Sequence, residues 1–208
     1  MTALSSGQGL AEASGGRVSE EELLRAATYG LLGRLLVRTP DAELLRRLAA
    51  VAGEPGDEGL AGAWAALAAA ARDAVESELD DEYHQLFIGV GRGELVPFAS
   101  YYLSGFLMER PLGELRAELR ALGIARRPEV HEPEDHISAL CEVMALLISE
   151  PGYGPEAQRG FHARHFGPWA ERFFNDLERA SGARFYRPVG WLGRELMQLE
   201  RQYHGEWQ

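Results

Sequence analysis

Apolar residues recur every three or four positions along most of the chain, which is the spacing of an α-helix. The first such run follows Ser19, which forms a capping-box pattern with Glu22. We find no segment of alternating apolar and polar residues, no internal repeat, and no Gly/Ser-rich linker beyond the N-terminus. The pattern predicts an all-α fold of about eight or nine helices, at 20–38, 42–53, 60–79, 80–89, 101–110, 111–123, 133–150, 156–180 and 188–204.

The length and composition fit one folded domain. At 208 residues the chain is long enough to bury a sizeable core. Its 46% hydrophobic and 25% charged residues match those of globular proteins. Ser, Gly and Ala dominate residues 1–18, where we expect a disordered tail. We predict a single globular, bundle-like helical domain over 19–208, and we leave room for a sub-boundary near 125–131.

Charge and cysteine usage exclude several classes of protein. A net charge of −11 argues against nucleic-acid binding, which needs a basic face, and favours a basic or neutral partner. The one cysteine, Cys141, excludes an internal disulfide framework and a thiolate zinc site, and it suits a reducing compartment. The chain has no apolar run of the roughly 18 to 20 residues that a membrane span needs, and its opening lacks the features of a secretory signal. We expect a soluble, cytoplasmic protein with no stable membrane association.

The segment HEPEDH gathers two histidines and three carboxylates just before an apolar run. His131 and His136 are five residues apart with Pro133 between them, whereas metal ligands on one helical face are three or four apart. A second pair, His162 and His165, has helical spacing but joins the first only if their helices pack face to face. The pattern therefore disfavours a metal site.

The same segment predicts a helix start. Proline suits a first helical turn, so we expect Pro133 to begin a helix with Asp135 and His136 in that turn. Carboxylates there complement the helix dipole, which is the expected role of Glu132 and Glu134 taken alone. Asp135 and His136 precede an apolar face, so at least one of them should point into a partly enclosed place, where the carboxylate would raise the pKa of the imidazole.

Signals for catalysis or nucleotide binding are weak. Cys141 lies in the apolar run, where a cysteine is usually a small buried hydrophobe, and the chain has no G-x-S-x-G motif. The stretch GVGRG at 89–93 has no strand before it and no Lys-Ser/Thr after it, so we interpret it as a helix end followed by a turn that needs positive φ. We predict no catalytic residue, no metal and no bound cofactor.

A second unusual stretch is aromatic. Tyr83, Leu86 and Phe87 share one helical face by their spacing, and Pro97 and Phe98 fall in an irregular segment where aromatic residues often line a groove. An aromatic groove beside an acidic pair suits a peptide whose apolar residues are flanked by arginines.

These two stretches together resemble a known family. EYHQLFIGVGRGELVPFASYYL is similar to the pattern E-Y-x-x-L-F, a Gly-containing spacer, then Pro, Ser and an aromatic residue. EPEDHIS is similar to an E-P-x-D-H signature, and it follows about 45 residues later. In this order, on a helical chain of this length, the pair resembles the TorD/DmsD/NarJ family of redox-enzyme maturation chaperones, over about Ser19 to the C-terminus.

The resemblance implies a cytoplasmic chaperone, not an enzyme. Its partner would be the precursor of a molybdopterin-dependent oxidoreductase, held through its twin-arginine signal peptide or N-terminal segment until the cofactor is inserted. Export would follow, although a client that is never exported stays open. Some relatives swap domains into dimers, so a monomer and a domain-swapped homodimer both stay open. From the residues and the resemblance together, we assign Asp135 to an arginine of the peptide and His136 to hydrogen bonding or positioning. Glu132 either supplies a second carboxylate or caps the helix. Peptide-binding residues carried over by the motifs are Tyr83, Leu86, Phe87, Pro97, Phe98, Tyr101, Glu132, Asp135 and His136.

Two other functions stay open at this point. One is a helical metal-dependent hydrolase that uses His131, Asp135, His136 and a histidine of the HARH stretch. The other is a structural subunit of a larger complex, in which the face over 83–102 is a permanent interface.

Overall fold

Helices make up nearly all the regular structure in the computed structural model, which describes residues 4–6, 18–51, 58–89 and 92–205. Ten α-helical stretches occur there, and two π-helical segments continue α-helices without a break, so the described residues hold nine continuous helices. The predicted all-α class of eight or nine helices is confirmed. The chain divides into two units, one of Met1–Leu36 with Phe98–Trp169 and one of Val37–Pro97 with Ala170–Gln208.

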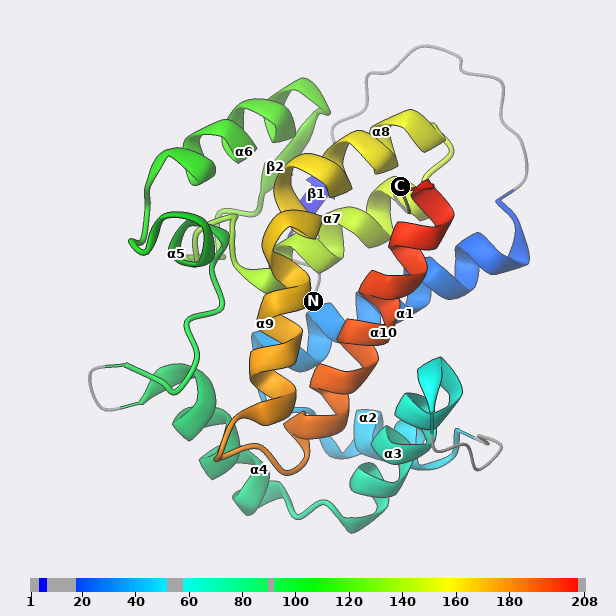
Figure 1. The fold of residues 1–208 in the computed structure, drawn as a ribbon, viewed down its shortest axis with the longest axis vertical. Coiled ribbons are helices and arrows are strands. Elements are labelled where there is room, and N and C mark those ends of the chain that lie inside the picture. The colour runs from blue at the N-terminus through cyan, green and yellow to red at the C-terminus, as the bar shows by residue number, and fades with distance from the viewer. Residues whose placement is uncertain (1–3, 7–17, 52–57, 90–91, 206–208) are drawn as a thin grey trace. The chain divides into compact units, whose positions relative to one another are not determined.

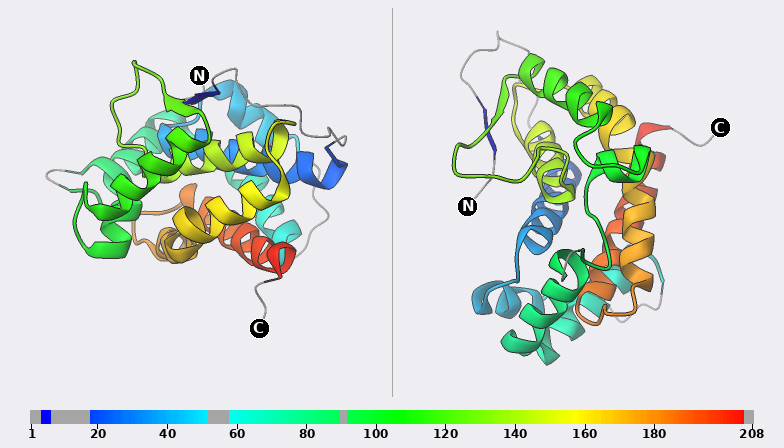
Figure 2. Two further views of the ribbon diagram at one scale, coloured as in Figure 1. Left: turned by 90° about the horizontal axis from the view of Figure 1, so that it is seen from above. Right: turned by 90° about the vertical axis from the view of Figure 1, so that its left-hand side faces the viewer.

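The first unit is built around α7, whose inward face carries fully buried apolar side chains such as Leu140 and Met144. α7 packs beside α8, and α5 lies beside α6 (Figures 1 and 2). A Cβ at Gly33 of α1 would lie only 3.2 Å from Ser138 O, so glycine permits the close approach of α1 to α7. The elements of this unit are β1 (Leu4–Ser6), α1 (Glu20–Val37), α5 (Ala99–Ser104), α6 (Arg110–Ala121), β2 (Ile124–Arg126), α7 (Ile137–Ser149), α8 (Pro155–Phe161) and the π-helical segment η2 (His162–Phe166).

Two short strands were not expected from the sequence. β1 pairs antiparallel with β2, with Leu4 opposite Arg126 and Ser6 opposite Ile124. Three residues are too few to show an alternating pattern, and the pairing partner is about 120 residues away along the chain, so local periodicity carries no signal for it. The rest of the predicted tail over 1–18 lies outside the described residues, apart from Val18.

The second unit is organised by α10, which packs against α3 and α9 (Figure 1). A Cβ at Gly190 would stand 2.5 Å from Glu178 N, and one at Gly193 would stand 2.1 Å from the Phe174 ring. These two glycines, one turn apart, let the helices approach closely. The elements of this unit are α2 (Ala42–Ala49), α3 (Gly59–Asp73), α4 (Glu76–Tyr83), the π-helical segment η1 (His84–Ile88), most of α9 (Gly167–Arg179) and α10 (Tyr186–His204).

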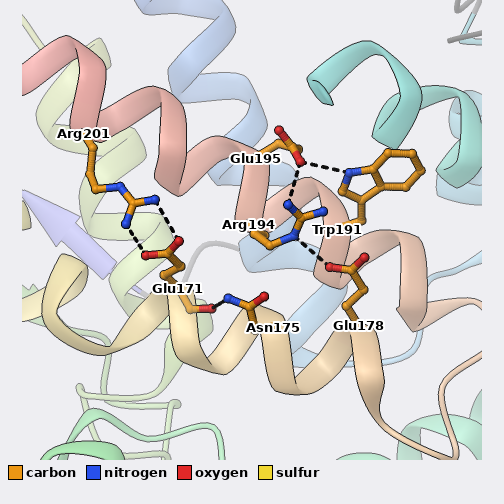
Figure 3. Close-up of polar contacts among 7 residues, drawn as sticks. All are labelled: Glu171, Asn175, Glu178, Trp191, Arg194, Glu195 and Arg201. Atoms are coloured by element: carbon orange, nitrogen blue, oxygen red, sulfur yellow. Dashed lines mark hydrogen bonds and ion pairs between the residues drawn. The ribbon is translucent and has the colours of Figure 1, made fainter. Parts of the chain in front are cut away.

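Ion pairs flank this glycine contact between α9 and α10 (Figure 3). Arg201 makes a bidentate pair with Glu171, and its Nη2 donates to Glu171 Oε1 at 2.8 Å. Arg194 Nε donates to Glu178 Oε2 at 2.8 Å. The planar bidentate pair of Arg201 and Glu171 fixes orientation as well as adding attraction, and with the Arg194–Glu178 pair it holds the two helices in register.

Several helix boundaries differ from the prediction. The run over 60–79 is interrupted at Ala74 and Val75, both extended, although neither glycine nor proline marks the break. The helix predicted at 101–110 begins at Ala99 and ends at Ser104, because Gly105 takes a left-handed conformation with φ 84°. The capping box is as predicted: Ser19 N donates to Glu22 Oε2 at 2.9 Å and Glu22 N donates to Ser19 Oγ at 3.2 Å.

Among the helices that the structure describes, none is both long and apolar enough to cross a membrane. The domain limits proposed from the sequence, a tail over 1–18, a domain over 19–208 and a sub-boundary near 125–131, stay predictions.

Candidate functional site

The HEPEDH segment folds into a turn that is fastened to the start of α5. His136 N donates to Pro133 O at 3.1 Å and closes the turn over residues 133–136. Ala99 N donates to Asp135 O at 2.9 Å, and Phe98 forms an isolated antiparallel bridge with His136. The HEPEDH segment and the end of the aromatic stretch, from Phe98 onwards, therefore meet within the first unit.

Asp135 is the polar centre of this junction. Its side chain is only 1% exposed, and its Oδ2 accepts the backbone N–H of Ser100 at 2.9 Å. That N–H lies in the first turn of α5, where it has no partner within the helix. No donor among the described residues reaches Asp135 Oδ1, and Ser100 Oγ is also buried without a partner. A buried carboxylate oxygen without a donor is costly, so Asp135 keeps one oxygen available for an incoming donor.

His136 is the N-cap of α7, not a first-turn residue. Its Nδ1 accepts the backbone N–H of Ser138 at 3.2 Å and lies 2.6 Å from Ser138 Oγ. Burial lowers its pKa to about 4, so the expected increase from a neighbouring carboxylate is wrong and the ring is neutral at pH 7. A neutral ring whose Nδ1 accepts carries its proton on Nε2. The helix predicted from Pro133 starts instead at Ile137, because the imidazole caps it.

The two glutamates of the segment do not complement a helix dipole. Glu134 pairs with Arg116 at 2.8 Å and Arg126 at 3.4 Å, ahead of the helix. Burial acts to raise the pKa of Glu134, but the Arg116 hydrogen bond and the charges of both arginines outweigh it and hold the pKa below its ordinary value. Glu132 is exposed to solvent, so its carboxylate is the accessible one in the segment.

The aromatic residues of the first unit cover this turn only in part. Phe98 is half-buried, and its ring meets the His136 ring edge-on at 5.0 Å between centroids. Tyr101 is half-buried on α5, and Tyr102 packs on Trp169 at 5.3 Å. Phe98 and Tyr101 therefore keep part of their surface open to a partner.

The remaining predicted apolar residues form a second group, in the second unit. Tyr83 and Phe87 are half-buried, 5.1 Å apart, and both rings contact Tyr186. Leu86 is fully buried and Pro97 is buried, so neither presents its side chain to a partner. The π-helical turn η1 follows directly after Tyr83, and π-turns of this kind occur often at functional sites.

Two glutamates with clear structural roles were missed. Glu82 is buried, and its carboxylate accepts the backbone N–H groups of Arg184, Phe185 and Tyr186 at 2.8, 3.1 and 2.8 Å. It therefore satisfies the free donors at the start of α10. The single sequence signal for Glu82 was its place at the head of the E-Y-x-x-L-F pattern.

Glu94 acts in the same way on the neighbouring loop. It accepts from Ser181 N at 2.6 Å, Ser181 Oγ at 3.0 Å and Gly182 N at 3.0 Å. Burial acts to raise the pKa of Glu94, yet these hydrogen bonds leave the pKa below its ordinary value. Both glutamates hold the segment that joins α9 to α10.

The glycine stretch and the histidines give no support to nucleotide or metal chemistry. Gly89 ends η1 with φ 60°, which confirms the predicted turn, and part of the stretch, 90–91, lies outside the described residues. His165 Nε2 lies 2.8 Å from Glu118 Oε2, and His162 packs on Phe166. Within the described part of the chain, no three His, Cys, Asp or Glu side chains are placed to hold a metal ion. The hydrolase alternative therefore has no assembled ligand set there.

Comparison with known proteins points to one family. The family model described as nitrate reductase delta subunit matches residues 54–175. The chain is 33% identical over 79 residues to the chaperone protein TorD of Photobacterium profundum, covering 37% of each chain. It is 28% identical over 126 residues to the probable Tat proofreading chaperone DmsD of Haemophilus influenzae, covering 60% of this chain and 61% of that one. These alignments span between 37% and 61% of the relatives' own lengths.

A solved structure shares the fold. The crystal structure of a protein from Archaeoglobus fulgidus, described as a redox enzyme maturation protein, superposes with a TM-score of 0.57 at 19% identity. The match covers 90% of this chain and 99% of the other.

Proposed function

Since this chain belongs to the nitrate reductase delta subunit family, with the TorD/DmsD/NarJ redox-enzyme maturation chaperones, we propose that it binds the twin-arginine leader of a molybdoenzyme precursor. It holds the precursor for cofactor insertion and assembly before export, and it works in the cytoplasm. The relatives are named as chaperones, and a chaperone needs a recognition surface but no catalytic group.

The observation that carries the proposal is the 133–136 turn. Asp135 offers one buried carboxylate oxygen that no described donor satisfies, and Glu132 offers an exposed carboxylate three residues earlier. A guanidinium group is planar and donates up to five hydrogen bonds, so it suits two carboxylates at different depths. Glu132 attracts an arginine at the surface, and Asp135 accepts from it below.

His136 favours the same ligand by staying uncharged. A protonated imidazole beside the turn would repel an arginine, whereas burial keeps the pKa of His136 at about 4 and its ring neutral at pH 7. Its cap on α7 also fixes the backbone that follows Asp135. His136 is therefore a positioning residue.

The apolar part of the leader needs aromatic surface. In the first unit Phe98 and Tyr101 supply it, and in the second unit Tyr83 and Phe87 are proposed to contact the peptide as well. Leu86 and Pro97 are buried, so we assign them no direct contact with the peptide. A micromolar complex requires about 8 kcal/mol, which a charge-assisted pair and a few apolar side chains supply after association costs.

The test is a titration of the purified protein with a fluorescent leader peptide of a molybdoenzyme encoded beside it. Glu132→Gln is the matched variant, because the exposed side chain has no structural role that its loss would disturb. We expect micromolar binding to the wild type, weakened about five- to tenfold both by Glu132→Gln and by glutamines in place of the peptide's arginines. No binding of any such leader to the wild type would refute the proposal.

A further inference from the structure

An exposed apolar loop follows α5. Leu103, Phe106, Leu107 and Met108 are 43%, 69%, 50% and 73% exposed, and the segment 103–108 contains no charged residue. Single exposed apolar residues are ordinary, but four large ones within six positions make a patch, and such patches mark binding surfaces. We call residues Leu103–Met108 the apolar loop.

The loop has a defined backbone. Gly105 ends α5 in a left-handed conformation, and Ser104 Oγ donates to Ser100 O at 2.7 Å. Met108 has φ 60°, which is disfavoured for a residue with a long side chain. Residues held in such conformations concentrate at ligand-binding sites, where the surrounding structure offsets the strain. The backbone of the loop is therefore defined where it leaves α5 and again at Met108.

A hollow connects this loop to the 133–136 turn. Its volume is about 430 Å³, and its lining includes Met108 and Glu109 as well as His131 and Pro133. Since Glu132 stands between His131 and Pro133 in the chain, the hollow reaches from Met108 to the segment that carries the proposed arginine site.

The charges around the hollow balance. Arg110 pairs with Glu114 at 2.6 Å, and Glu134 pairs with both remaining arginines of the lining, Arg116 and Arg126. Together with Glu109, three glutamates therefore oppose three arginines along the hollow, and Glu132 adds a carboxylate only at the end beside His131 and Pro133. A further guanidinium would meet three others here, so the hollow does not suit the leader's arginines. A balanced rim beside an apolar loop suits an uncharged, apolar segment.

From this arrangement we infer that the apolar loop binds the apolar stretch that follows the arginines of the leader. The inference rests on the proposed function and adds a direction: the arginines lie at Glu132 and Asp135, and the peptide runs across the hollow to Leu107 and Met108. The need for such a surface is clear, since a leader's apolar stretch has about 7 to 15 residues and the first unit's motif residues expose only parts of Phe98 and Tyr101.

The test uses two peptides and three variants of the full chain. One peptide is the intact leader, and the other keeps the arginines but has Gly and Ser in place of the apolar stretch. Leu107→Asn and Met108→Asn each remove an exposed apolar side chain, and asparagine tolerates the left-handed backbone of position 108. Leu24→Gln, on α1, is the control, because Leu24 is a leucine whose exposure of 65% lies between those of Leu107 and Met108. Thermal unfolding of each variant verifies the fold.

We expect each loop variant to weaken binding of the intact leader about tenfold and to leave binding of the Gly/Ser peptide unchanged. The control Leu24→Gln should not weaken binding of the intact leader. Equal weakening of both peptides, or none, would overturn the inference while the leader function stood. If a loop variant instead converted a dimer to a monomer in size-exclusion chromatography with leader binding intact, the loop would be a subunit interface and the inference would be wrong. Failure of the wild type to bind the intact leader would overturn the proposed function and this inference together.

Discussion

The buried neutral His136 makes the stability of the protein depend on pH in a calculable way. Burial lowers the pKa of the folded-state ring from the ordinary 6.5 to about 4. Between these pH values the unfolded chain binds a proton that the folded chain does not. The contribution of His136 to the free energy of unfolding is therefore fully present above pH 6.5 and decreases as the pH falls towards 4. Each pH unit in this window costs about 1.4 kcal/mol. Lowering the pH from 7.5 to 5.0 should therefore remove about 2 kcal/mol.

His136→Asn isolates this contribution. Asparagine is a good N-cap and keeps an acceptor for the N–H of Ser138, but it does not titrate. Its free energy of unfolding should therefore lose about 2 kcal/mol less than the wild type's between pH 7.5 and 5.0. His131→Asn removes an exposed histidine and should keep the wild-type dependence.

Urea unfolding followed by circular dichroism at both pH values measures these differences, and an NMR titration of the imidazole gives the pKa directly. An unchanged pH dependence in His136→Asn, or an imidazole midpoint near 6.5, would refute the claim that burial keeps this ring neutral.

Further predictions concern helix packing and helix capping. Gly190→Ala should lower the free energy of unfolding by about 1–3 kcal/mol, since a Cβ there would meet Glu178 N, whereas Gly30→Ala, with open space around it in α1, should raise it by about 0.5–1 kcal/mol. Urea unfolding of both variants checks this pair, and equal effects would contradict it. Glu82→Ala should cost about 2–3 kcal/mol and loosen the start of α10, because three backbone donors lose their acceptor. Amide hydrogen exchange at residues 184–186 should speed up, and unchanged exchange would argue against the capping role.

The all-α class could be predicted from the apolar periodicity because residues close in the sequence mark where several helices begin or end. Ser19 and Glu22 are three residues apart and cap α1 through their own side chains, so they are readable without a partner. Gly89 likewise ends its helix through its own backbone conformation. Signals of this kind act within one helical turn, where residues that are close in the sequence are also in contact.

The parts that could not be predicted depend on distant segments. Glu82 caps a helix that begins 104 residues later, and nothing beside it in the sequence identifies that partner. Asp135 is buried because residues Phe98–Ser100 dock on it, although Ser100 is 35 residues away in the sequence. This docking also keeps the residues before Ile137 out of the helix that was predicted to begin at Pro133. The exposed apolar loop was missed for a related reason: the sequence predicted one helix over 101–110, whereas Gly105 ends α5 and leaves the apolar side chains of residues 106–108 exposed beyond it.

The most direct test of the central claim, that Asp135 receives an arginine of the leader, is a double-mutant cycle. Asp135→Asn keeps an oxygen for the N–H of Ser100 and removes the charge, and it is paired with the leader peptide whose arginines are glutamines. Fluorescence titration of the four combinations gives the coupling free energy between carboxylate and guanidinium. We predict a coupling of about 1.5–3 kcal/mol, the strength of a charge-assisted hydrogen bond. Additive effects, with no coupling between Asp135 and the arginines, would contradict it.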